Sequence, residues 1–322
     1  MENTNKTTRR DMIKKAAIGA TAMAASTIFP AITQASERNQ EPVNYQLSGK
    51  TAFITGGARG IGLAIAEEMA RAGANIVLFD IASGQIPHVG YAVATEGDLQ
   101  SAKEQIEVLN IKCLAIKGDV RKRDDLENAM KKAVSAFGSL DIVVANAGVT
   151  QVGAIEEFSP EEISVVYDIN VEGVVKTTQA AAPIMKQQKS GKMIFISSAL
   201  GRMGNELFPI YASSKWAVIG IAKSAALSYG RDNILCNVVS PGLVRTKFAD
   251  NPYVLGKMIP NDPAPTFDKV SEMLRPGNLI DVGHLELEDV AKATMIFATD
   301  ATSKVTGEVF DVSYGSLARS IA

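Results

Sequence analysis

The protein has 322 residues, 46% of them hydrophobic and 21% charged, and its formal net charge at pH 7 is −2. This balance is typical of a globular chain with one large α/β domain or two smaller ones, and it excludes a strongly basic nucleic-acid-binding surface. Cys113 and Cys236 lie in apolar runs, and His88 and His284 have no partners at metal-ligand spacing, so the sequence indicates neither a disulfide scaffold nor a metal site.

The first 35 residues carry the features of an export signal in their usual order. They hold five Lys or Arg residues and two acidic ones, which gives a net charge of +3. Arg9 and Arg10 in "TRRDMIKK" precede an apolar run, residues 16–29. That run is shorter than the about 20 apolar residues needed to span a bilayer. The stretch "TQA", ending at Ala35, has the small-x-small form of a cleavage site.

This segment resembles a twin-arginine signal, which implies that the export machinery carries an already folded protein together with any cofactor it holds. A disordered basic tail and a membrane anchor are the alternatives. We expect a signal peptide over residues 1–35 and a polar linker over residues 36–48.

From residue 49 onward, apolar β-rich runs alternate with helical patterns. The runs are continuous in their hydrophobicity, which indicates strands buried on both faces. Strands that alternate with helices predict a parallel, doubly wound, Rossmann-like α/β sheet in a single domain over residues 49–322. The expected strands are 51–55, 75–80, 113–119, 141–148, 192–198, 234–242 and 308–312, and the expected helices are 62–72, 98–109, 124–137, 160–189, 211–229 and 288–298.

The first strand runs into "TGGARGIG", residues 55–62, a glycine-rich turn from strand to helix. Glycines there let the backbone approach a pyrophosphate at the helix N-terminus, where free N–H groups favour anions. Asp80 ends the second strand, and its carboxylate would bind the adenosine ribose and repel a 2′-phosphate, which favours NAD over NADP. Arg59 could meet such a phosphate, but we expect Asp80 to dominate. The expected cofactor-binding residues of this region are Gly56, Arg59, Gly60, Ile61, Gly62 and Asp80.

A second group of residues has the pattern of proton-transfer chemistry. Tyr211 and Lys215 are four residues apart on one expected helix and therefore share a face. A phenol has an ordinary pKa of about 10, so it becomes a base near neutral pH only if a nearby cation stabilises the phenolate. Lys215, helped by a positively charged nicotinamide ring, would provide that cation. Ser198, at the end of the preceding strand, would hydrogen-bond the substrate oxygen.

With these motifs the chain resembles the short-chain dehydrogenase/reductases over residues 45–322. The resemblance rests on motifs that occur in register: Thr55-Gly56-x-x-x-Gly60-x-Gly62, Asp119-Val120, Asn146-Ala147-Gly148, Asn170, Ser198, Tyr211 with Lys215, and Pro241-Gly242. It implies an NAD(P)-dependent alcohol dehydrogenase with Asn170, Ser198, Tyr211 and Lys215 as catalytic residues.

The resemblance also implies roles for residues that spacing alone would not assign. Asn170 would hold a water that links Lys215 to solvent as a proton relay. The adenine would contact Asp119 and Val120, and the residues beside the sheet, the nicotinamide and its ribose would be Asn146, Ala147, Gly148, Tyr211, Lys215, Pro241, Gly242, Val244 and Thr246.

The main departure from the family pattern is a long segment between the second strand and the next helix, residues 81–99. A tolerated surface loop is one interpretation. The segment also resembles the subgroup that contains carveol dehydrogenases and mycofactocin-dependent alcohol dehydrogenases. That resemblance implies that this insert lies over the cofactor and makes NAD slow to exchange.

Two further segments, residues 199–210 and 245–285, are expected to enclose the substrate. The second contains apolar residues such as Phe248, Leu255, Met258 and Phe267, which suggest a hydrophobic secondary alcohol or ketone of the terpenoid, steroid or alicyclic kind. Core or subunit contacts are the alternative for some of these side chains, and sugars remain possible substrates.

Together these features predict an exported, periplasmic NAD-dependent alcohol dehydrogenase with tightly held NAD, regenerated by an external electron acceptor. A homotetramer is expected from resemblance only. The alternatives are a cytoplasmic dehydrogenase with exchangeable NAD and a non-catalytic NAD-binding sensor.

Overall fold

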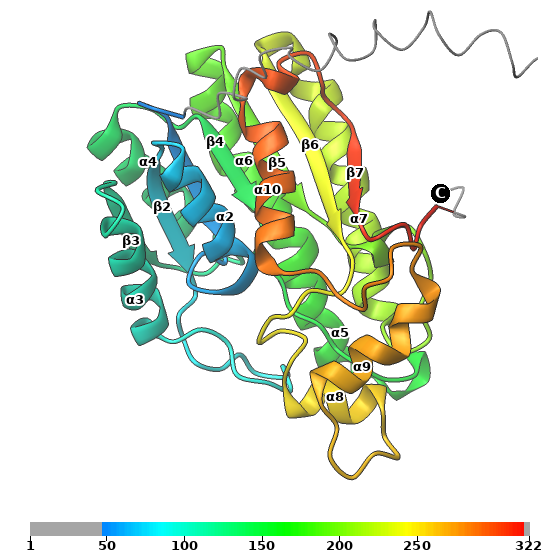
Figure 1. Ribbon diagram of the computed structural model, residues 1–322. Coiled ribbons are helices and arrows are strands. Elements are labelled where there is room, and N and C mark those ends of the chain that lie inside the picture. The colour runs from blue at the N-terminus through cyan, green and yellow to red at the C-terminus, as the bar shows by residue number, and fades with distance from the viewer. Residues whose placement is uncertain (1–46, 319–322) are drawn as a thin grey trace, which may run out of the picture. The chain divides into compact units, whose positions relative to one another are not determined.

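The computed structural model describes residues 47–318, and the expected signal peptide lies outside this range. Within it, seven strands form one sheet in the order β3-β2-β1-β4-β5-β6-β7, and every neighbouring pair is parallel (Figure 1). The predicted α/β class is confirmed. The strands are β1 (Thr51–Thr55), β2 (Asn75–Asp80), β3 (Cys113–Lys117), β4 (Ile142–Ala145), β5 (Gly191–Ile196), β6 (Ile234–Pro241) and β7 (Val309–Val312).

Helices cover both faces of the sheet, as Figure 1 shows. One face packs against α2, α3 and α10, and the other against α4, α6 and α7. The helices are α2 (Gly60–Arg71), α3 (Glu96–Glu107), α4 (Arg123–Phe137), α5 (Pro160–Tyr167), α6 (Gly173–Gln188), α7 (Pro209–Tyr229), α8 (Pro252–Met258), α9 (Phe267–Leu274) and α10 (Leu287–Ala298). No helix within residues 47–318 combines the length and the hydropathy that crossing a membrane would take.

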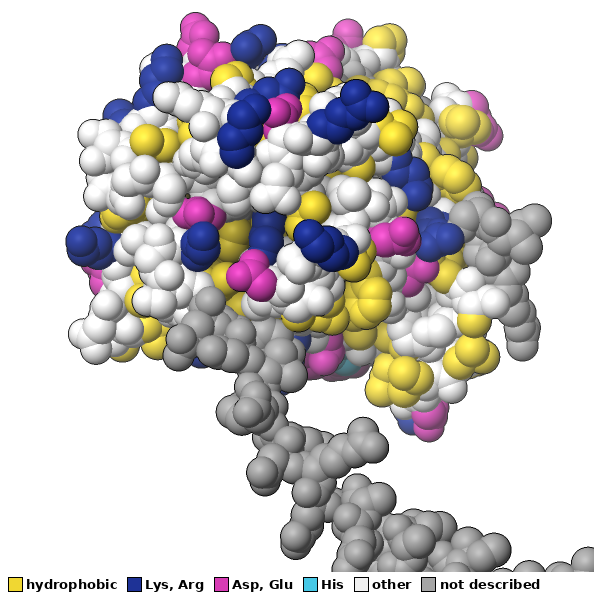
Figure 2. Space-filling model, turned by 90° about the horizontal axis from the view of Figure 1, so that it is seen from above, with side chains coloured by type: hydrophobic (Ala, Val, Ile, Leu, Met, Phe, Trp, Pro, Cys, Tyr) yellow, Lys and Arg dark blue, Asp and Glu magenta, His cyan; other side chains and the backbone are white. Residues whose placement is uncertain are grey.

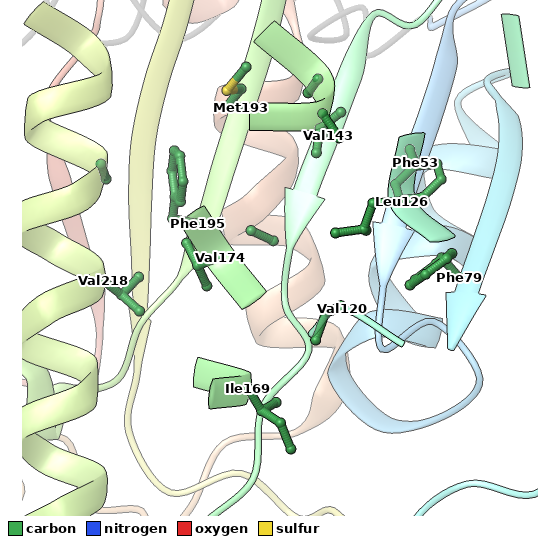
Figure 3. Packing of buried hydrophobic residues seen from close by; sticks show 14 of the residues in the cluster. Phe53, Phe79, Val120, Leu126, Val143, Ile169, Val174, Met193, Phe195 and Val218 are labelled. Atoms are coloured by element: carbon green, nitrogen blue, oxygen red, sulfur yellow. The ribbon is translucent and has the colours of Figure 1, made fainter. Parts of the chain in front are cut away.

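Strand side chains alternate between two apolar layers, which explains why the strands read as continuous hydrophobic runs. Phe53 and Phe79 point to the layer under α4, where their ring centroids are 5.5 Å apart beside Leu126 (Figure 3). Ile54 and Leu78 point to the opposite layer, under α2. Both faces of the central strands are therefore dry, and polar chemistry is confined to the strand ends.

Ion pairs lie at the end of the sheet where the strands begin. Lys50 pairs with Asp141 at 3.3 Å, and Lys192 pairs with Asp300 at 2.9 Å. Figure 2 views this end and shows basic and acidic side chains interspersed over it. The functional site is at the other end, where the strands finish.

Three local features differ from expectation. The helix expected over residues 160–189 is divided by a π-helical turn, Asp168–Glu172. The segment 245–285 contains two short helices, α8 and α9, that the sequence pattern did not indicate. Leu47, placed in the expected linker, is 3% exposed and packs against the core, so the packed domain includes it.

Candidate active site

The glycine-rich turn after β1 makes a cradle that only glycines permit. Gly56 and Gly60 have φ values of +65° and +59°, a region that favours glycine. A Cβ atom on Gly62 would lie 2.2 Å from the Gly56 carbonyl oxygen. The N-terminus of α2, which begins here, has no side-chain cap. Its free N–H groups are therefore available to an anion.

Asn146 and Thr55 fix this turn to the end of β4. The Asn146 side-chain amide donates to the carbonyl oxygens of Thr55 at 2.9 Å and Gly56 at 3.2 Å. The Thr55 hydroxyl accepts from the backbone N–H groups of Asn146 and Ala147. Thr55 thus helps to hold the glycine-rich turn against the end of β4. The sequence pattern predicted no role for Thr55 beyond its place in the motif.

Asp80 lies at the end of β2 and is 7% exposed. Its carboxylate accepts hydrogen bonds from the backbone N–H groups of Ala58 and Ala82, both at 3.1 Å. Burial raises the pKa of Asp80, and these two hydrogen bonds and the nearby Arg59 oppose that rise. These bonds fix the Asp80 carboxylate at the end of β2, where it could accept hydrogen bonds from the ribose hydroxyls of a bound dinucleotide.

Asp119, which the sequence places at the adenine, is already engaged by protein. Arg121 binds its carboxylate through Nε at 2.9 Å and Nη2 at 2.6 Å. Burial opposes ionisation of Asp119, but the Arg121 hydrogen bonds outweigh it and the pKa is lowered. Arg121 was not expected from the motif, and an adenine would meet the pair rather than Asp119 alone. Val120 beside it is 8% exposed.

Ser198, Tyr211 and Lys215 lie close together in the structure. Ser198 follows β5, whereas Tyr211 and Lys215 lie one turn apart on α7. The Lys215 Nζ atom is 5.6 Å from the centroid of the Tyr211 ring and donates to the carbonyl oxygen of Ile196 at 2.9 Å. All three residues border the same cavity.

The protein alone does not lower the pKa of Tyr211. Burial raises it to about 12, and a hydrogen bond with Ser198 only partly offsets this rise. Burial also lowers the pKa of Lys215 to about 8, since its ammonium is removed from water. The expectation that Lys215 makes the phenol acidic therefore holds only if a further positive charge enters the cavity.

Asn170 lies in the π-helical turn and is fully buried. Its Oδ1 accepts from Val149 N at 2.8 Å, and its Nδ2 donates to Val149 O and to Ser214 Oγ. These bonds use both amide protons, so the side chain holds the loop beside Gly148. The expected proton-relay water stays a prediction.

A cavity of about 530 Å³ connects these groups at the carboxyl ends of the strands. Gly62 and Asn170 do not line this cavity and lie behind the residues that do. The other expected site residues line it: Gly56, Arg59, Gly60, Ile61, Asp80, Asp119, Val120, Asn146, Ala147, Gly148, Ser198, Tyr211, Lys215, Pro241, Gly242, Val244 and Thr246.

Both expected substrate segments line the cavity, mostly with apolar side chains, namely Leu200, Met203, Phe208, Phe248, Val254, Met258 and Leu274. The polar residues Asn205, Lys247 and Asn278 of the same segments also line it. The alternative interpretation holds for Leu255 and Phe267, which pack with Val270 in a small core between α8 and α9. The helices α8 and α9, which share this small core, thus supply part of the apolar lining of the cavity.

The insert, drawn in cyan in Figure 1, lines the cavity with Ile86, Tyr91 and Val93. Arg59 of the glycine-rich turn donates to the carbonyl oxygen of Ala92 at 2.6 Å. The Tyr91 hydroxyl accepts from Thr150 N at 2.9 Å. Part of the insert is therefore packed into the site, with Tyr91 and Ile86 buried, while other residues of it face solvent.

The C-terminal segment contributes a wall that the sequence reading did not assign. Tyr314, at the end of β7, lines the cavity, and its hydroxyl accepts from Leu243 N at 2.6 Å. A Cβ atom on Gly242 would lie 2.6 Å from that hydroxyl, so glycine is required there.

We next compared the chain with known protein families and structures. A family model described as short chain dehydrogenase matches residues 50–253. The chain belongs to the short-chain dehydrogenase family. Its relatives include oxidoreductase UcpA of Salmonella typhimurium, 32% identical over 84% of this chain and 95% of the relative. The (−)-trans-carveol dehydrogenase of Rhodococcus erythropolis is 29% identical over 84% of this chain and 98% of its own.

Two solved structures of short-chain dehydrogenases share the fold. Carveol dehydrogenase from Mycobacterium avium, in complex with NAD, has a TM-score of 0.82 at 29% identity and matches 85% of this chain and 99% of its own. A short chain dehydrogenase from Mycobacterium paratuberculosis, bound to NAD, has a TM-score of 0.77 at 36% identity over 84% and 98%.

Proposed function

We propose that this short-chain dehydrogenase interconverts a hydrophobic secondary alcohol and its ketone with NAD. The observation that carries the proposal is one cavity that joins a dinucleotide cradle to the Ser198, Tyr211 and Lys215 cluster. Mass spectrometry of the small molecule released on denaturation, followed by assays of alicyclic alcohols, tests it. An unrelated released ligand would contradict the proposal.

The crevice fits NAD on its own geometry. The uncapped N-terminus of α2 and the Gly62 cradle suit the pyrophosphate, and Asp80 suits the adenosine ribose. A bound nicotinamide would, in its oxidised form, add a positive charge to the cavity and supply the acceptor for the hydride of the carbinol carbon, which neutralises the ring.

The side chains of this chain handle the proton. Ser198 hydrogen-bonds the substrate oxygen and orients the carbinol toward the cofactor. Tyr211, as phenolate, would take the proton of the alcohol hydroxyl, whose oxygen then forms the C=O bond. Lys215, close to the phenol, stabilises the phenolate in the water-poor cavity. In the reverse direction the Tyr211 hydroxyl protonates the ketone oxygen.

Asp80→Ser is expected to weaken NADH binding about 10- to 100-fold, because charge-assisted hydrogen bonds to the ribose are lost. NADPH binding should improve relative to NADH, since the repulsion of the 2′-phosphate disappears. Fluorescence titration with both reduced dinucleotides measures the ratio. An unchanged ratio would show that Asp80 does not select the cofactor.

The position of the insert favours slow cofactor exchange. Its apolar residues line the cavity and the Arg59–Ala92 hydrogen bond holds it to the glycine-rich turn, and enclosing a ligand in this way would act chiefly on its dissociation rate. Protein purified without added nucleotide should therefore contain NAD. An empty site would favour the alternative of exchangeable NAD.

We also propose export through the twin-arginine route, with an external electron acceptor that regenerates the held cofactor. Retained NAD would allow an enzyme to work in the periplasm, where no free pool is expected. Arg9→Lys with Arg10→Lys should keep the protein in the cytoplasmic fraction of cells. Unaltered distribution would favour a cytoplasmic enzyme.

A homo-oligomer, expected to be a tetramer, is part of the proposal. Exposed apolar side chains on α7 favour it, since Leu227 is 87% and Trp216 44% exposed. Light scattering in solution decides the state, and a monomer at micromolar concentration would contradict it.

A further inference from the structure

The insert and α8 both bind the loop that follows β4. The Gln151 side chain joins them, because its Nε2 donates to the His88 carbonyl oxygen of the insert and its Oε1 accepts from the Tyr253 hydroxyl of α8 at 2.7 Å. Gln151 is 1% exposed. One buried amide therefore holds the insert with one end and the substrate helix with the other.

Direct packing reinforces this connection. A Cβ atom on Gly90 would lie 2.4 Å from a carbon of the Tyr253 ring, so the insert backbone lies directly against that ring. The rings of Tyr91 and Tyr253 have centroids 6.3 Å apart. Van der Waals contact and hydrogen bonding thus act at the same place.

The insert backbone is also held in an uncommon conformation at this point. His88 has a φ of +63°, the left-handed region that costs a residue other than glycine free energy. Such a conformation persists where surrounding contacts fix it, and the hydrogen bond from Gln151 to the His88 carbonyl is one such contact.

The contacts connect two ends of the cavity without entering it. Tyr91 of the insert lines the cavity, as does Val254 of α8. Gln151 and Tyr253 are not among the lining residues. They are placed to couple the cover of the cofactor crevice to the wall of the substrate end.

We propose that Gln151 and Tyr253 are positioning residues that fasten the insert to α8, so that the dinucleotide leaves only when both undock together. This Gln151–Tyr253 clasp rests on the proposed function for the identity of the dinucleotide. The substrate helix is then part of the cofactor lock. The competing arrangement is an insert held by its own anchors alone, such as the Arg59–Ala92 hydrogen bond.

Tyr253→Phe tests the clasp, because it removes the hydroxyl and keeps the ring. Protein loaded with NADH is chased with excess NAD, and release is followed by NADH fluorescence. Release should be about 5-fold faster than in the unaltered protein, because the hydrogen bond to Gln151 is lost together with the long one that the hydroxyl accepts from Val152 N at 3.4 Å. Tyr167→Phe is the matched control, since that hydroxyl bonds Ser213 Oγ at 2.8 Å, away from the insert.

Hydrogen exchange gives a second readout that needs no cofactor. In Tyr253→Phe, amides of residues 86–93 and of α8 should exchange faster together, whereas Tyr167→Phe should leave both unchanged. Gly90→Ala, made from the insert side, should produce the same paired acceleration. Melting temperatures identify any variant that loses its fold.

Release and exchange rates equal to those of the control would overturn the clasp, as would acceleration confined to one of the two segments. If no NADH binds, the proposed function fails, and hydrogen exchange alone still decides whether the insert and α8 open as one unit.

Discussion

Tyr211→Phe is expected to reduce turnover by about 10²- to 10⁴-fold, the usual contribution of a general acid or base. The variant should still contain NAD, because the ring remains and the glycine-rich turn and Asp80 are untouched. Alcohol oxidation with an artificial electron acceptor and mass spectrometry of bound nucleotide measure the two properties. In a dehydrogenase this variant should lose turnover while it keeps bound NAD. A non-catalytic NAD sensor would show no turnover in either the variant or the unaltered protein.

Tyr229→Phe is a suitable control for this experiment. Tyr229 lies at the end of the same helix and contacts Lys186 through its ring face, with the Nζ atom 4.9 Å from the centroid. It should keep full turnover. If Tyr211→Phe retained turnover equal to this control, the phenol would not be the proton acceptor, and the mechanism would be wrong.

Lys215→Met is expected to abolish turnover yet stabilise the fold at pH 7. Burial lowers the pKa of Lys215 from 10.5 to about 8, so the folded protein holds this charge at a cost of about 3 kcal/mol. Losing the hydrogen bond to Ile196 O returns about 1 kcal/mol of that, so a net gain of about 2 kcal/mol is expected. Denaturant unfolding at pH 7 measures it.

The pH dependence gives this prediction its sign. Between about pH 8 and 10.5 the unfolded chain binds more protons at Lys215 than the folded one, so the stability of the unaltered protein rises with pH in that window. The advantage of Lys215→Met should therefore vanish near pH 10. Lys223→Met on the same helix is the control, because Lys223 is exposed and bonds Gly307 O. A gain that persists at pH 10 would exclude a buried charge as its cause.

Sequence patterns predicted the frame well, because the signals were local. Each of the seven strands starts within one residue of its expected start. The glycine-rich turn follows β1 and Asp80 ends β2, where the apolar runs predict these strand ends. Tyr211 and Lys215 share a face because helical spacing alone places them so. These are properties of short stretches of chain.

What the sequence could not predict depends on contacts between distant segments. The π-helical turn at Asn170 reflects its bonds to Val149 and Ser214, which no helical period encodes. The short helices α8 and α9 lie in a proline-rich segment and share a small core of Leu255, Phe267 and Val270, while Tyr253 of α8 packs on the insert. The raised pKa of Tyr211 arises from burial, which a spacing rule does not measure.

Edge strand β7 and Tyr314 come later in the chain than nearly all other residues of the cavity, whereas β1 and its glycine-rich turn come first. During synthesis the glycine-rich turn therefore leaves the ribosome well before the Tyr314 side of the cavity does. A polypeptide that stops short of Tyr314 would lack that wall, so its cavity would hold a cofactor less firmly.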